Sequence, residues 1–316
     1  MQIWRSPPQI LASGSVEVST ALAENSGGGS SLRSRLTGDM RVRVAVGVLL
    51  VVMLCGLFAP VLAPYDPRAQ LDIAHLQTQP PSVAHPLGTD LFSRDVLSRV
   101  LYGTRVSMSV AVIAVAVSMI FGTCVGALSG YAGGTIDAIV MRFVDAALSI
   151  PAVLLLIVVI ALWGHISVAA LTLLLAGVGW FGVSRIVRAE ALAVRDTDYV
   201  VAARALGLPA WRILLRHVLP NALGPAVVTA SLSVGNVILL EAGLSYLGIG
   251  VRPPMPSWGN IIEEGSTRFS DAWWLTVFPG LAILITVFAC NALGDALRDA
   301  LDPRQLHTMH DDAPFA

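Results

Sequence analysis

Long uncharged stretches alternate with charged ones along this chain. Between successive Asp, Glu or Arg positions, five windows run for 22 to 39 residues: 44–65, 106–136, 146–184, 217–240 and 272–294. A helix needs about 20 predominantly apolar residues to cross a bilayer, where a charged side chain is costly. The longest window has room for two helices, and Trp163, Gly164 and His165 near its middle suit the turn between them. The pattern therefore predicts an all-α polytopic membrane protein with six transmembrane helices.

Composition supports this prediction and excludes several kinds of chemistry. Hydrophobic residues make up 55% of the chain and charged residues 13%, about half the ~25% charge of an ordinary soluble protein. A soluble fold of this composition would expose large apolar patches. All 20 basic residues are arginine, and the absence of lysine excludes a Walker A nucleotide site and a Schiff-base lysine. If ATP drives this protein, another subunit must bind it.

The remaining motifs predict neither catalytic residues nor a metal site. Cys55, Cys124 and Cys290 are isolated within apolar windows, so neither a disulfide nor a thiolate metal site is expected. The net charge of −1 indicates no nucleic-acid partner. An intramembrane enzyme lacks support because neither His-Glu-x-x-His nor Gly-x-Ser-x-Gly occurs. A secondary transporter that works without ATPase subunits is a different-class alternative, but its expected charged sites at membrane depth are missing from the windows.

Arginine distribution orients the chain. The two tails, 137–145 and 185–216 hold 14 of the 20 arginines, whereas the two loops on the other side hold six. Because cytoplasmic loops carry the excess of positive charge, both termini are expected in the cytoplasm.

The windows and the composition divide the chain into five parts. Residues 1–40 are polar, contain a Gly-Gly-Gly-Ser run, and predict a disordered cytoplasmic tail. The first transmembrane helix covers 41–65, a proline-punctuated extracytoplasmic segment covers 66–105, the main helical core covers 106–300, and a cytoplasmic tail covers 301–316. Met40 directly before Arg41 leaves a second possibility, that translation starts at Met40.

Small residues predict one helix contact. Gly122, Gly126 and Gly130 repeat every fourth residue and therefore lie on one face of the second span. In membranes, small residues allow helix backbones to approach closely. We expect another helix to pack on this face, although glycine is also common in membrane helices generally.

The charged stretch at 185–221 predicts a helical hairpin between the fourth and fifth spans. Residues 194–206 read as a short helix that Gly207 ends in the C′ position. Pro209 suits the first turn of a second helix, which Pro220 ends, leaving Asn221 as N-cap of the fifth span. The alternative is a basic juxtamembrane loop that binds anionic lipid.

The order of residues in this hairpin resembles a known family. YVVAARALG (199–207) and RHVLPN (216–221) are similar to the EAA-type signature of ABC importer permeases, with Val201 in place of the signature glutamate. HPLGTDLFSRDVLSRVLYGTRVS (85–107) and LSYLGIGVRPPMPSWG (244–259) resemble the C-type permease of dipeptide, oligopeptide and nickel importers. The resemblance covers about 42–305.

The resemblance implies a fold, partners and a substrate class. The expected fold is the type I ABC importer permease (MetI-like) fold, with a cytoplasmic coupling loop at 190–221. Expected partners are a homologous B-type permease, two ABC ATPase subunits that carry ATP and Mg, and an extracytoplasmic solute-binding protein. The chain itself would need no cofactor. It would form half of a pore for di- or oligopeptides in the cell (inner) membrane, with nickel, glutathione or haem as alternative cargo.

Two sets of site residues are expected, the first from the resemblance and the second from an ionisable residue at the outer end of the fifth span and the proline-rich loop at 251–259. The set expected to contact an ATPase is Ala202, Ala203, Arg204, Gly207, Pro209, Arg216, Leu219 and Pro220. Glu241, Arg252 and Trp258 are candidates for an outer gate or for contact with the solute-binding protein. The alternatives are an interfacial carboxylate that faces water at Glu241, and a passive connection stiffened by proline at 251–259.

Overall fold

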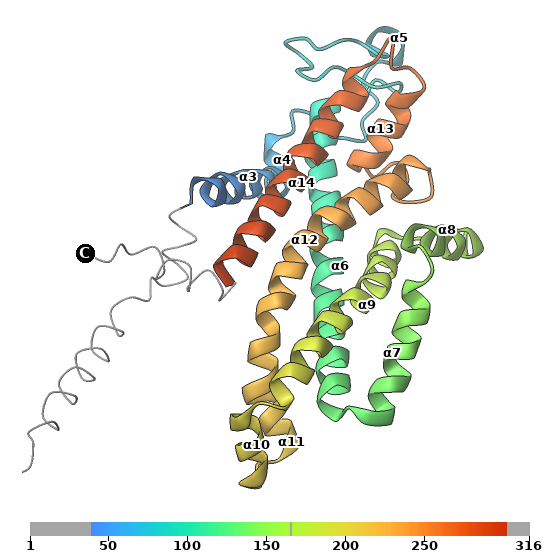
Figure 1. Ribbon diagram of the computed structural model, residues 1–316. Helices are drawn as coiled ribbons and strands as arrows, with labels where there is room; N and C mark the ends of the chain where they lie inside the picture. Colours follow the sequence, from blue (N-terminus) through green and yellow to red (C-terminus); the bar gives the residue numbers. More distant parts are fainter. Residues whose placement is uncertain (1–38, 165, 302–316) are drawn as a thin grey trace, which may run out of the picture.

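The chain folds into a bundle of helices (Figure 1). The computed structural model describes residues 39–164 and 166–301, so the predicted disordered tails lie almost entirely outside the described residues. Within these two ranges all named elements are helical, which confirms the predicted all-α class. The elements are α3 Met40–Leu57, α4 Ala59–Leu62, α5 Ile73–Leu76, α6 Val96–Ala132, α7 Gly134–Leu148, α8 Ala152–Trp163, α9 Val168–Arg195, α10 Asp198–Ala205, α11 Ala210–Ile213, a π turn Leu214–Val218, α12 Leu219–Tyr246, α13 Trp258–Ser266 and α14 Trp274–Leu301.

The helices account for the six predicted crossings. In the described part of the chain, α3, α6, α9, α14 and the run Ala210–Tyr246 are each long and apolar enough to span a membrane. α7 and α8 pass the same test only when they are taken together, and they meet at a bend of 82°; counted as one span, they give the sixth crossing.

Two helices begin in segments that charge counting assigned to loops. α6 starts at Val96, because the Asp95 carboxylate accepts a hydrogen bond from the Ser98 amide and caps the helix. α7 starts at Gly134, so the predicted loop at 137–145 is wrong. Asp137 is tolerated inside α7 because Arg188 donates to it from Nε at 2.5 Å and from Nη2 at 2.6 Å. Counting charges along the sequence treats Asp137 and Arg188 as unpaired, and therefore places the start of the helix after Asp137.

The predicted close packing on the glycine face of the second span is confirmed. α6 packs along α9, and a Cβ atom built on Gly126 would lie 2.4 Å from the Ser184 carbonyl oxygen. At Gly130 a Cβ atom would lie 2.7 Å from the Arg188 carbonyl oxygen. Hydrogen therefore is the only side chain that fits between these two backbones.

Substituting Gly126 is expected to destabilise the α6–α9 contact. Gly126→Ala should cost about 1–3 kcal/mol because backbone atoms must move apart to admit the methyl group. The melting temperature of the detergent-solubilised protein, followed by size-exclusion chromatography after heating, measures this cost. Gly182→Ala is the matched control, because a Cβ atom on Gly182 in α9 meets no neighbour within 4 Å. Equal melting temperatures for the two variants would contradict the expected backbone clash.

The predicted break at Pro220 and Asn221 is wrong. α11, the π turn and α12 follow one another without interruption, and the Leu219 amide donates to the Leu214 carbonyl, five residues back. A proline ring normally collides with the carbonyl four residues before it, and the wider π turn makes room for the ring of Pro220. The Asn221 side chain donates to the His217 carbonyl at 2.6 Å and is not an N-cap.

Candidate functional site

Two short helices project at one end of the molecule. Figure 1 shows α10 and α11 at the end opposite to α5 and α13. We call residues 196–213 the α10 tip. α9 continues to Arg195, and α10 begins only after Thr197, whose hydroxyl donates to the Val194 carbonyl at 2.7 Å. The predicted helix start at 194 is therefore wrong, since a hydroxyl side chain that bonds back to the preceding turn ends α9 and separates the two helices.

Gly207 terminates α10 as predicted. The Leu208 amide donates to the Ala203 carbonyl at 3.2 Å, and the Gly207 amide donates to the Arg204 carbonyl at 3.0 Å. This pair of bonds is the Schellman motif, which needs a left-handed residue at C′. The φ of Gly207 is +81°, a conformation that glycine adopts without strain.

The buried side of the α10 tip holds the hairpin together. Val200 and Ala203 of α10 pack with Ile213 and Val218, and the same cluster reaches back to Ala191 in α9. Ala203, one of the predicted contact residues, therefore faces inward. The cluster joins α10 to both flanking helices, so the tip is continuous with α9 on one side and α12 on the other.

The remaining predicted residues lie on or near the surface of this end. Ala202, Arg204, Gly207 and Pro209 are exposed in the tip, Arg216 and Pro220 are exposed beyond it, and Leu219 is half-buried. Sequence reasoning missed the large apolar side chains beside them. These are Tyr199, Val201, Leu206, Trp211 and Leu215, with exposed fractions from 49% to 81%. An exposed apolar patch of this kind marks a contact surface for another protein or a membrane.

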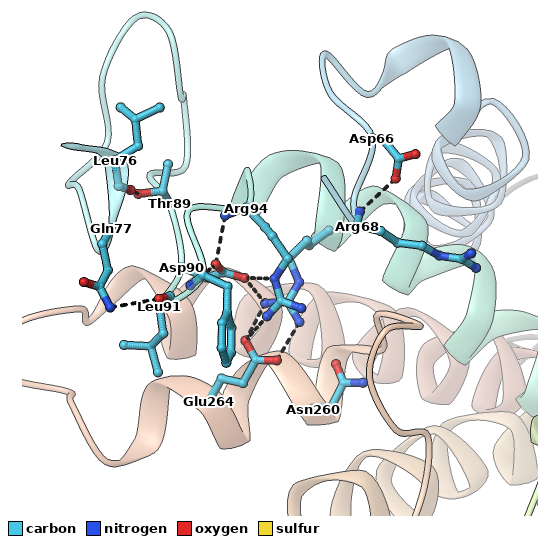
Figure 2. A network of polar contacts seen from close by, with 12 residues as sticks. Asp66, Arg68, Leu76, Gln77, Thr89, Asp90, Leu91, Arg94, Asn260 and Glu264 are labelled. Atoms are coloured by element: carbon cyan, nitrogen blue, oxygen red, sulfur yellow. Dashed lines mark hydrogen bonds and ion pairs between the residues drawn. The ribbon is translucent and has the colours of Figure 1, made fainter. Parts of the chain in front are cut away.

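A network of four buried charges lies at the opposite end, near α13. The Arg94 Nε atom donates to the Asp90 carboxylate at 2.6 Å, and its Nη2 atom donates to Glu264 of α13 at 2.9 Å. Arg99 of α6 donates to the same two carboxylates, and its Nη2 atom lies 2.8 Å from Oε1 of Glu264. Figure 2 shows this network of contacts. Each arginine therefore bridges both acids, and the network ties the 88–95 loop to α6 and α13.

Local hydrogen bonds position the loop that carries this network. Asp90 accepts from the backbone amides of Phe92 and Arg94 at 2.8 and 2.9 Å. Asp95 caps α6 and also contacts His85 Nδ1 at 3.0 Å. Sequence reasoning counted Arg94 only as a loop charge. The spacing Asp-x-x-x-Arg-Asp-x-x-x-Arg over residues 90–99 is the signal that could have indicated paired charges.

Glu241 and Trp258 lie in the interior at the same end. Glu241 is fully buried in α12, where the Ser107 hydroxyl donates to it at 2.8 Å and the Ser245 hydroxyl at 2.7 Å. Trp258 is also fully buried, and its backbone amide lies 3.4 Å from the Ser107 oxygen. Neither side chain reaches the surface of this chain, so the alternative of an interfacial carboxylate that faces water does not describe Glu241. A role for Glu241 and Trp258 in an outer gate or in contact with a solute-binding protein stays a prediction. Arg252 is exposed, and its role stays a prediction.

Acidic and sulfur-containing side chains do not gather into a metal site in the described ranges. There, no group of three His, Cys, Asp or Glu side chains is arranged to hold an ion. The polar clusters at both ends are built from ion pairs and serine hydroxyls that join neighbouring helices.

Comparisons with known proteins agree on one class. Residues 122–307 match the family described as binding-protein-dependent transport system inner membrane component, and residues 33–81 match the N-terminal transmembrane domain of oligopeptide transport permease C. A putative peptide transport system permease protein of Brucella abortus is 42% identical over 85% of this chain and 90% of its own length. A glutathione transport system permease protein of Pectobacterium atrosepticum is 40% identical over 83% of this chain and 87% of its own length. A dipeptide transport system permease protein of Haemophilus influenzae is 41% identical over 81% of this chain and 88% of its own length.

Proposed function

We infer the function from the family: this chain belongs to the binding-protein-dependent transport system inner membrane components and is a permease subunit of an ATP-driven importer. The subunit forms part of a pore and performs no catalysis itself. ATP and Mg are bound by two partner ATPase subunits, a homologous B-type permease supplies the other half of the pore, and a solute-binding protein delivers cargo. The α10 tip lies on the cytoplasmic side, and both termini share that side.

The exposed apolar side chains of the α10 tip carry this proposal. Leu206 is 81% exposed and Trp211 is 59% exposed. Both lie in the short hairpin between two spans, so contact with lipid along a transmembrane helix does not explain their exposure. An ATPase subunit that covers them would hold α10 firmly. Because the tip packs against α9 and runs directly into α12, movement of the ATPase is passed to two spans at once.

Short peptides are the proposed cargo. Three relatives that are at least 40% identical to this chain are named for peptide, dipeptide and glutathione transport. Glutathione is itself a modified tripeptide, so all three names describe small zwitterionic molecules with free carboxylates. We propose the same class for this chain.

Reconstitution tests the proposed function. Liposomes that contain this chain, its B-type permease and both ATPase subunits should accumulate labelled Ala-Ala when ATP and the solute-binding protein are supplied. Uptake should fall to background when the Walker A lysine of the ATPase subunits is replaced, because that lysine contacts the nucleotide phosphates. Uptake by this chain alone, driven by an ion gradient, would instead support a secondary transporter.

A further inference from the structure

A cavity of about 440 Å³ lies at the end of the molecule that carries α13. Four segments that are distant in sequence line it, and they include Asp66 and Arg68 after α4, Tyr102, Arg105 and Val106 of α6, Val168 at the start of α9, and Met255 before α13. The volume falls in the range of about 300–1,000 Å³ that small-molecule sites occupy. None of the sites described above uses this cavity.

The arginines of this cavity are bound differently from those of the buried network. Arg94 and Arg99 each contact two carboxylates. The Arg68 Nη2 atom instead lies 3.1 Å from the Met255 sulfur, which is a weak acceptor. In the described part of the chain no carboxylate lies within 4.0 Å of the guanidinium of Arg105. Two guanidinium groups therefore line one cavity without an acidic partner.

One acid accompanies these arginines. Asp66 accepts from the backbone amide of Arg68 at 2.8 Å through Oδ1 (Figure 2), which fixes the carboxylate at the cavity wall. The lining therefore carries two positive charges and one negative charge. Such a wall suits a ligand that carries both a carboxylate and an ammonium group, because each ligand charge then meets an opposite charge. The apolar surface of Val106 and Met255 suits a hydrophobic side chain.

We propose that this cavity is a subsite for short peptides on their way into the pore. Arg105, with Arg68, donates hydrogen bonds to the C-terminal carboxylate, and Asp66 accepts from the N-terminal ammonium group. Tyr102, Val106 and Met255 contact the peptide side chain. This inference rests on the proposed function, because it names the substrate contact of the same importer.

Photolabelling of the whole importer in lipid nanodiscs tests the subsite. The probe is a dipeptide of alanine and benzoylphenylalanine, used as the free acid and as the C-terminal amide, without ATP or solute-binding protein. The acid should label the segments 66–68, 102–109 or 255–256. Labelling should be about tenfold weaker for the amide and for Arg105→Gln, since each loses a charge-assisted hydrogen bond. Arg105→Lys should recover part of the labelling.

Arg268→Gln is the matched control, because Arg268 is exposed at the same end but does not line the cavity. It should label like the wild type. Equal labelling by acid and amide, or unchanged labelling of Arg105→Gln, would overturn the subsite. Uptake of Ala-Ala by the same purified wild-type importer, reconstituted into liposomes with ATP and the solute-binding protein, separates the two proposals. Uptake without specific labelling would contradict only the subsite, whereas absence of uptake would contradict the importer function.

Discussion

Gly207→Trp is expected to abolish transport while leaving the protein folded and membrane-inserted. A Cβ atom on Gly207 meets no neighbour within 4 Å, so the indole would not disrupt the hairpin core and would project from the α10 tip. There it would lie where the ATPase subunit is proposed to bind. The φ of +81° adds strain of about 1–2 kcal/mol for a residue with a side chain. Both ATP-driven uptake and the stimulation of ATP hydrolysis by loaded solute-binding protein should fall to background.

The control for this variant is Gly207→Asn. Asparagine tolerates the left-handed conformation and has a small side chain, so this variant should retain most of the transport activity. Co-purification of the ATPase subunits with each variant reports the contact directly. Uptake by Gly207→Trp at the wild-type rate would show that the ATPase subunit does not bind at the α10 tip.

Glu264→Ala is expected to prevent stable folding of the end that carries α13. Removing this carboxylate leaves Arg94 and Arg99 buried beside a single remaining acid, Asp90. Breaking a buried ion pair from one side typically costs about 3–5 kcal/mol, because the other charge loses its partner away from water. We expect a large loss of detergent-stable protein, measured as the monodisperse fraction in size-exclusion chromatography.

Glu263→Ala is the matched control for this loss. Glu263 is the neighbouring acid in α13 and is exposed, so its substitution should leave the yield and the melting temperature close to wild type. A stable Glu264→Ala protein would show that the network is not needed to hold the 88–95 loop against α13.

The sequence predicted features that depend on local pattern. The five long spans followed from apolar length, the α6–α9 contact followed from three glycines on one helix face, and the end of α10 followed from Gly207. Each of these depends on residues within one turn or one span of each other. Their physical cause is therefore visible in a continuous stretch of sequence.

The features that escaped prediction depend on groups that are distant in the chain. Asp137 sits inside a helix because Arg188, 51 residues later, neutralises it. Glu241 is buried because Ser107, 134 residues earlier, donates to it. Counting charges along the sequence assigns such groups to water, and only the folded arrangement supplies their partners. The continuity of the helix through Pro220 was missed for a different reason, since the π turn that accommodates the ring has no simple sequence signal.

The bend between α7 and α8 has a consequence for backbone hydrogen bonding in the membrane. The 15 residues of α7 rise only about 22 Å, less than the ~30 Å of a bilayer core. The bend at 148–151 is exposed on this chain, and lipid tails offer backbone groups no hydrogen bonds. The chain supplies them locally: the Asp145 carbonyl accepts from the Ser149 amide at 3.0 Å, the Ala146 carbonyl from the Ser149 hydroxyl at 2.7 Å, and the Ala147 carbonyl from the Ile150 amide at 3.3 Å. The backbone can therefore change direction on the lipid-facing side of the bundle without leaving these three carbonyls unsatisfied.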